Sequence, residues 1–151
     1  MLTVKAKYAL RAVLDLANAE AGRPVFIADI ARRQDIPRRF LENILIELKK
    51  SGLVVSHRGK HGGYALARPA AGISFAEVIR ISDGPLALAP CASKTAYRRC
   101  DDCKDEATCA VRRVLMEVRD ATAAILERTS LADFATLPLE ALTNGTSQSP
   151  L

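Results

Sequence analysis

Residues 26–68, FIADIARRQDIPRRFLENILIELKKSGLVVSHRGKHGGYALAR, decide the fold of this chain. Apolar residues recur every three or four positions in residues 27–34 and again after Pro37, which is the spacing of two amphipathic helices. Asp35 and Ile36 form the turn between them, and Pro37 fits the first helical position, where its missing N–H costs nothing. Gly52 suits the left-handed residue that ends the second helix. The stretch therefore predicts a helix-turn-helix.

Two short apolar segments follow this helical pair. Residues 53–57 and 64–67 read LVVSH and YALA, and both favour strands. Between them lies RGKHGG, a glycine-rich and cationic hairpin tip whose backbone can approach a phosphate closely. Two helices followed by a basic hairpin predict a winged helix-turn-helix that binds double-stranded DNA.

The second helix of the pair has two different faces. Its predicted buried stripe comprises Phe40, Leu41, Ile44, Leu45 and Leu48. The other face begins with arginine, glutamate and asparagine side chains, which can contact guanine, cytosine N4 and adenine in the major groove. The alternative is a helical hairpin with a solvated charged face, and the basic hairpin favours DNA recognition over it. The predicted DNA contacts are Arg38, Arg39, Glu42, Asn43, Arg58, Lys60 and His61.

The charge of the chain is unevenly distributed. The net charge is +5 over 151 residues, but residues 1–68 hold 13 Lys and Arg against 6 Asp and Glu, whereas residues 69–151 hold 9 against 11. A basic N-terminal half indicates a polyanionic partner there. The absence of Trp and an aromatic content of 5% favour helices. No signal peptide and no apolar stretch of about 20 residues is evident, so we expect a cytoplasmic protein with no membrane partner.

Four cysteines, Cys91, Cys100, Cys103 and Cys109, lie within 19 residues. Thiols stay reduced in the cytoplasm, so such a group is more typical of metal ligands or redox sensors than of structural disulfides. Thiolates suit iron–sulfur clusters, zinc and copper(I). The cysteine spacing leaves open a cluster, a structural zinc that uses the Cys100-x2-Cys103 half-site, a thiol–disulfide switch and inert cysteines.

A long helix is expected after Cys109, to about residue 127. Its apolar residues recur with heptad-like spacing, which suits a helix that pairs with a second copy, although a helix packed on its own domain has a similar pattern. The expected seam comprises Val111, Leu115, Val118, Thr122 and Ile125, widened by Val114, Ala121 and Leu126. A two-fold homodimer would place two recognition helices on a palindromic operator.

Several segments together carry a resemblance to a known family. KYALRAVLDLA, ARRQDIPRRFLENILIELKKSGLV, RGKHGGYALARP, ISFAEVIRISDGP and the final SLADF are similar to the bacterial winged-helix transcriptional regulators of the IscR/NsrR/RirA family over about residues 1–135. The resemblance implies a homodimeric DNA-binding regulator, often a repressor. It also implies an iron–sulfur cluster, 2Fe-2S or 4Fe-4S, whose state controls DNA binding.

The resemblance also suggests how the cysteines would serve. Cluster-bearing relatives usually offer three cysteines and one further ligand, and Cys91, Cys103 and Cys109 match the three. Some relatives have a histidine three residues after the last cysteine, where this chain has Arg112, which cannot be a ligand. Within the resemblance, Cys100 is therefore the candidate for the fourth place.

The sequence thus predicts a mainly α protein with a two-stranded wing, a cysteine-rich loop and a long C-terminal dimerisation helix. The expected parts are a winged helix-turn-helix domain at residues 1–84, a cluster loop at 85–109, a dimerisation helix at 110–135 and a disordered tail at 136–151. The alternatives are a cluster-free thiol–disulfide regulator and, outside DNA binding, an iron–sulfur carrier. An enzyme such as a thiol oxidoreductase is disfavoured, because no βαβ pattern and no general base accompany Cys100-x2-Cys103.

Overall fold

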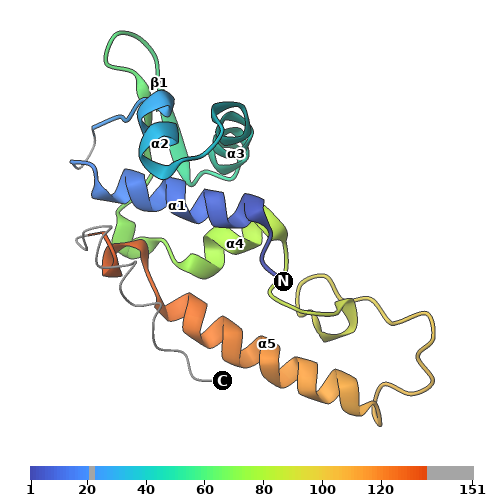
Figure 1. Ribbon diagram of the computed structural model, residues 1–151. Helices are drawn as coiled ribbons and strands as arrows, with labels where there is room; N and C mark the ends of the chain where they lie inside the picture. Colours follow the sequence, from blue (N-terminus) through green and yellow to red (C-terminus); the bar gives the residue numbers. More distant parts are fainter. Residues whose placement is uncertain (21–22, 136–151) are drawn as a thin grey trace.

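The computed structural model describes residues 1–20 and 23–135, so the tail expected to be disordered lies outside the described residues. The helices and strands are α1 (Val4–Asn18), α2 (Ile27–Gln34), α3 (Arg38–Lys50), β1 (Val54–His57), β2 (Gly63–Leu66), α4 (Phe75–Asp83) and α5 (Ala110–Arg128). Single 3-10 turns form at Ala70–Gly72, Pro90–Ala92 and Leu131–Asp133. The prediction of a mainly α winged helix-turn-helix is confirmed (Figure 1).

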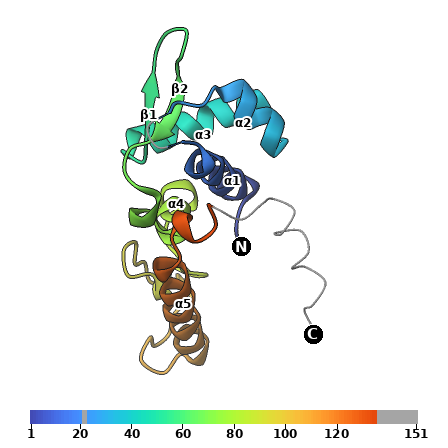
Figure 2. The same cartoon turned by 90° about the vertical axis from the view of Figure 1, so that its left-hand side faces the viewer.

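Helix α1 lies between the helix-turn-helix and α4 (Figures 1 and 2). Thr3 caps its N-terminus, since the Thr3 side-chain oxygen accepts a hydrogen bond from the Ala6 amide. Ala6, Ala9 and Ala12 are completely buried, and such small side chains allow neighbouring helices to approach closely. Val4, the first residue of α1, is exposed.

The turn of the helix-turn-helix depends on Asp35, whose backbone is left-handed (φ 51°, ψ 51°). Pro37 immediately precedes α3 and so lies one residue before its expected place. Four of the five expected stripe residues are buried, and the exception is Phe40, which is 43% exposed. Its ring packs edge-on against Tyr8 with the centroids 5.7 Å apart, which covers one side of it only.

The wing is an antiparallel pair in which Val54 lies opposite Leu66 and His57 opposite Gly63. Val25, in the segment before α2, joins it through two backbone hydrogen bonds of 2.8 Å with Tyr64. Gly63 has φ 134°, and a Cβ atom there would lie 2.2 Å from the carbonyl oxygen of Val25. A glycine is therefore required where the wing is fixed to the body.

Helix α5 lies at the opposite end of the molecule from the wing (Figure 2). It packs on α4 and on the turn Pro90–Ala92, yet none of its residues is fully buried. Arg80 of α4 pairs with Glu127 at 2.6 Å, and a bridge between Ser74 and Ser130 holds the end of the helix to the body. Within residues 1–20 and 23–135, no helix has both the length and the apolar character needed to cross a membrane.

Candidate DNA-binding surface and cysteine loop

The four predicted base-contacting residues lie together at the start of α3. Arg38, Arg39, Glu42 and Asn43 are all exposed. Arg38 and Glu42 are one helical turn apart, with the Arg38 Nε atom 3.4 Å from Glu42 Oε1. The early face of α3 therefore presents donors and acceptors outward without any rearrangement of the core.

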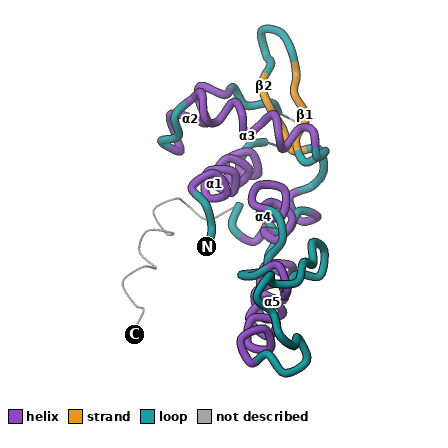
Figure 3. Tube along the Cα trace, turned by 90° about the vertical axis from the view of Figure 1, so that its right-hand side faces the viewer, coloured by secondary structure: helices purple, strands orange, loops and turns teal. Residues whose placement is uncertain are grey.

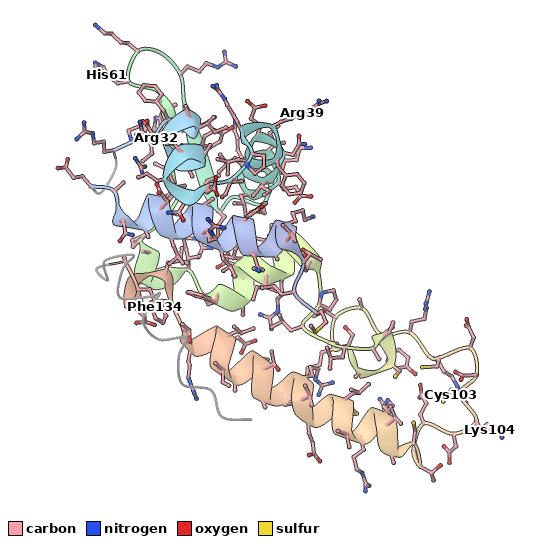
Figure 4. All side chains as sticks on the ribbon, viewed as in Figure 1. Arg32, Arg39, His61, Cys103, Lys104 and Phe134 are labelled. Atoms are coloured by element: carbon pink, nitrogen blue, oxygen red, sulfur yellow. The ribbon has the colours of Figure 1, made fainter. Side chains whose placement is uncertain are left out.

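The three predicted wing contacts, Arg58, Lys60 and His61, are exposed at the tip between β1 and β2. The tip is tightly folded, since a Cβ atom on Gly62 would lie 2.5 Å from the carbonyl oxygen of His57. Figure 4 shows His61 at the tip of the wing and Arg39 on α3, both at the same end of the molecule. The structure thus brings all seven predicted DNA contacts to one end.

A groove of about 490 Å³ connects the two elements. It is lined by the start of α2, by Arg38 and Glu42, and by Ser56, His57, Gly63 and Tyr64 of the strands. Ser56 and His57 are not among the predicted contacts, because the wing contacts were predicted from the charged residues of the tip alone. Both residues lie at the end of a predicted strand that leads into the basic tip, and this position in the sequence could have identified them.

Asp15 of α1 fixes the helix-turn-helix to the body. Its buried carboxylate accepts from Arg33 Nη2 at 2.7 Å, from Arg33 Nε at 3.0 Å and from Gln34 Nε2 at 3.0 Å. The hydrogen bond to Asp15 raises the pKa of Arg33 above its ordinary value. This partly buried cluster, at the end of α2, sets how α2 is held on α1.

Both ends of the cysteine loop, residues 91–109, contact α5. Cys91 lies in the turn Pro90–Ala92, which packs on α5, and is only 7% exposed. Cys109 is the residue before α5, and its sulfur accepts a hydrogen bond from the Arg112 amide at 3.4 Å. Figures 1 and 3 show the chain between them running beside α5. A change at either end of the loop therefore acts directly on this helix.

The loop brings two of its four thiols together. The nearby Cys91 thiol raises the pKa of the Cys100 thiol above its ordinary value. Among the described residues, no three His, Cys, Asp or Glu side chains are grouped closely enough to hold a metal ion, so Cys103 and Cys109 do not complete a site with this pair. Four thiols, two of them near each other, are a donor set that fits a soft-metal group. Residues 94–102 of the loop are exposed.

Two arginines of α5 hold the turn that carries Cys91. Arg112 Nε donates to the carbonyl oxygen of Cys91 at 3.0 Å, and Arg119 Nη1 donates to that of Ala92 at 2.5 Å. From the sequence, Arg112 was recognised only as a residue that cannot be a ligand, and Arg119 was not singled out. Their spacing of seven residues predicts that both arginines lie on one face of α5, but it does not predict which loop packs against that face.

Comparisons with known proteins agree on one family. The Rrf2 model, described as an iron-dependent transcriptional regulator, matches residues 2–136. An rrf2-like HTH-type transcriptional regulator of Rhodobacter capsulatus is 43% identical over 136 residues, 88% of this chain and 91% of that protein. Two solved structures are each 27% identical: CymR, the global cysteine regulator of B. subtilis (TM-score 0.75, 91% and 98% of the two chains), and T. potens IscR (0.73, 99% and 93%).

Proposed function

Since the chain belongs to the Rrf2 family of transcriptional regulators, we propose that it is a homodimeric repressor whose DNA binding is controlled by an iron–sulfur cluster on the cysteine loop. The family and its relatives are DNA-binding regulators and not enzymes, which removes the oxidoreductase alternative and leaves no support for a carrier without a DNA role. The observation that carries the proposal is that the cysteine loop starts on a turn packed against α5 and ends as the cap of α5.

The reading surface is the early face of α3 together with the wing tip. Arg38, Arg39, Glu42 and Asn43 contact base edges in the major groove, as the N-terminal part of a recognition helix does. Arg58, Lys60 and His61 contact the phosphate backbone or the minor groove. Their exposure at one end of the molecule supports this assignment. A repressor of this kind acts on chromosomal DNA and therefore in the cytoplasm.

The dimer forms along α5. One stripe of its exposed apolar residues comprises Val111, Val114, Val118, Ala121 and Ile125. They follow each other at alternating intervals of three and four residues, which is the spacing of a coiled-coil seam, and an exposed apolar stripe of this kind marks an interface. Leu115 and Thr122, which the sequence assigned to the seam, are half-buried within the same protomer. Two-fold pairing along the valine seam would place two copies of α3 on a palindromic operator.

Cys91, Cys100, Cys103 and Cys109 would hold the cluster. When bound, the cluster supplies a labile, redox-active iron centre that joins distant points of the loop. The chain's own contribution is to supply four thiolates, two of them already adjacent, and to connect the first and last cysteine to α5. Ordering of the exposed chain between them would fix the start of α5.

The test is the visible spectrum and the iron and sulfide content of protein purified anaerobically from iron-replete cells. We expect a coloured protein with stoichiometric iron and sulfide. Cys91→Ala, Cys103→Ala or Cys109→Ala should each bleach it, whereas Cys100→Ala should weaken retention of the cluster less. A colourless protein that contains stoichiometric zinc and no iron would contradict the proposal and favour a structural zinc site.

A second candidate is a cluster-free thiol switch, which is favoured because Cys91 and Cys100 are free thiols that lie near each other. Hydrogen peroxide would take two electrons from the two thiols, leaving a Cys91–Cys100 disulfide and two molecules of water. Mass spectrometry of peroxide-treated, metal-free protein under non-reducing conditions would find this disulfide, and a reductant would restore the original DNA affinity. A disulfide that leaves DNA affinity unchanged would exclude the switch.

A further inference from the structure

Helix α5 is joined to the turn Pro90–Ala92 by side-chain to main-chain hydrogen bonds from two arginines. Arg112 Nε donates to the Cys91 carbonyl at 3.0 Å, and Arg119 Nη1 donates to the Ala92 carbonyl at 2.5 Å. The amide of Arg112 also donates to the sulfur of Cys109 at 3.4 Å. Arg112 therefore touches the residues of both the first and the last cysteine of the loop.

These contacts are sheltered from water. Ala92 is 1% exposed, and the Arg119 side chain is 11% exposed. A sheltered carbonyl that loses its donor carries the full cost of desolvation, so the turn and the helix resist separation. Asp120 supports the arrangement, since its carboxylate pairs with Arg119 at 2.8 Å and with Lys94, from the loop itself, at 3.5 Å. Hydrogen bonding from Arg119 lowers the pKa of Asp120, so this carboxylate is charged at neutral pH.

The arginines and the valine seam occupy different faces of α5. Arg112 and Arg119 are seven residues apart and share one face, whereas the seam is centred on Val118 and lies roughly a third of a turn away. The same rigid helix thus contacts the cysteine loop on one side and presents the exposed valines on another. A displacement of the Cys91 turn would be passed to the seam by rotation or translation of α5.

We propose that Arg112 and Arg119 are positioning residues that couple the state of the cysteine loop to α5, and through α5 to the spacing of the two reading surfaces. This inference rests on the proposed function. Neither arginine touches DNA or a metal. Each one links the main chain of a cysteine-bearing turn to the helix, so that a change in the loop reaches DNA without altering any DNA contact.

The test measures DNA affinity for two preparations: protein reconstituted with ferrous iron and sulfide, and metal-free protein. The ratio of the two affinities is the coupling factor. The wild-type ratio should lie in the range typical of coupled sites, roughly 5–150-fold. Arg112→Gln and Arg119→Gln should bring it close to one while the metal-free protein keeps its DNA affinity and its dimer. Arg112→Lys, which keeps the charge and one donor, should restore part of the ratio. Arg113→Gln, a matched change at an exposed position on another face of α5, should leave it unchanged.

A second readout needs no cluster. In reduced, metal-free protein, N-ethylmaleimide should alkylate the sheltered Cys91 slowly, and Arg112→Gln or Arg119→Gln should accelerate the reaction while Arg113→Gln does not. An unchanged Cys91 rate together with an unchanged coupling factor would overturn the proposal. If wild-type protein shows no coupling at all, the proposed function fails, but the alkylation rates still decide whether the arginines hold the turn.

Discussion

At the residue scale, Gly63 fixes the wing to the rest of the molecule. Gly63 has φ 134°, which is a left-handed backbone conformation. A Cβ atom at this position would lie 2.2 Å from the Val25 carbonyl oxygen, so there is no room for a side chain. We expect Gly63→Ala to destabilise the protein by about 1–3 kcal/mol, the usual cost of such backbone strain, and to weaken DNA binding because the wing is displaced. Thermal unfolding and DNA affinity measure the two effects.

Gly72→Ala is the matched control for this change. A Cβ atom at Gly72 would have no neighbouring heavy atom within 4 Å, and this residue needs no left-handed backbone. Its unfolding temperature and DNA affinity should therefore resemble those of the wild type. Indistinguishable behaviour of the two alanine variants would show that the contact between Gly63 and Val25 does not limit the position of the wing.

The residues of the reading surface differ in what they should contact. Glu42 and Asn43 face outward early in α3, and Lys60 lies at the wing tip. Glu42→Ala or Asn43→Ala should change the preferred sequence, at about 1–3 kcal/mol for each lost base contact. Lys60→Ala should weaken all sites equally and reduce the salt dependence by about one unit. Binding to a panel of operator variants at several salt concentrations separates the two effects, and uniform losses from all three substitutions would refute the assignment.

At the scale of elements, the proposed dimer seam and the arginines that hold the Cys91 turn lie on different faces of α5. Val118, at the centre of the seam, is 39% exposed and contributes nothing to the buried core. Val118→Asp should therefore leave the protomer folded, while two carboxylates brought together across a two-fold axis cost several kcal/mol and separate the dimer. Light scattering after size exclusion measures the mass, and circular dichroism checks the fold.

Ala124→Asp provides the comparison, because it places the same charge at an exposed position of α5 outside the seam. It should remain dimeric. If Val118→Asp also stays dimeric at micromolar concentration, the valine seam is not the interface and the palindromic operator loses its support.

At the scale of the whole molecule, the cysteine loop and the reading surface lie at opposite ends (Figure 4). In the proposed dimer, an influence of one on the other can pass through α5, since half-sites one helical turn apart require a separation of about 34 Å. A change in α5 can alter this separation without touching a DNA contact. We therefore expect cluster-loaded and cluster-free protein to differ in affinity by about 1–3 kcal/mol, roughly 5–150-fold.

Fluorescence anisotropy on an operator selected from a random-sequence library measures this difference at matched salt. A difference in either direction supports regulation by the loop. Equal affinities on every selected operator would leave the cysteines without a regulatory role and make a purely structural metal the better explanation.

The sequence by itself determined the elements and their order. Helix and strand periodicity, Gly52 after α3 and the glycine-rich tip are local features, and each acts through the backbone of its own neighbourhood. For this reason the bounds of α2, α3, β1 and β2 agree closely with the predicted segments. The resemblance to a regulator family likewise depended on contiguous motifs.

Only the tertiary structure decided which side of each helix is covered. Phe40 fits an apolar stripe by spacing but is exposed, because the packing partner meets a different face. The apolar spacing places Leu115 in the seam and Val114 beside it, yet Leu115 is half-buried and Val114 is exposed. Helical periodicity defines an apolar face only approximately, so the choice depends on where the neighbouring elements lie.

The same limit applies to the cysteine loop. The sequence supplied the four cysteines, but not the proximity of Cys91 and Cys100 or the hydrogen bonds from Arg112 and Arg119. Those arginines lie 21 and 27 residues from the carbonyls that they hold. Such pairings arise when a loop folds back on a distant helix, and the packing of the whole chain, rather than any local spacing, determines them.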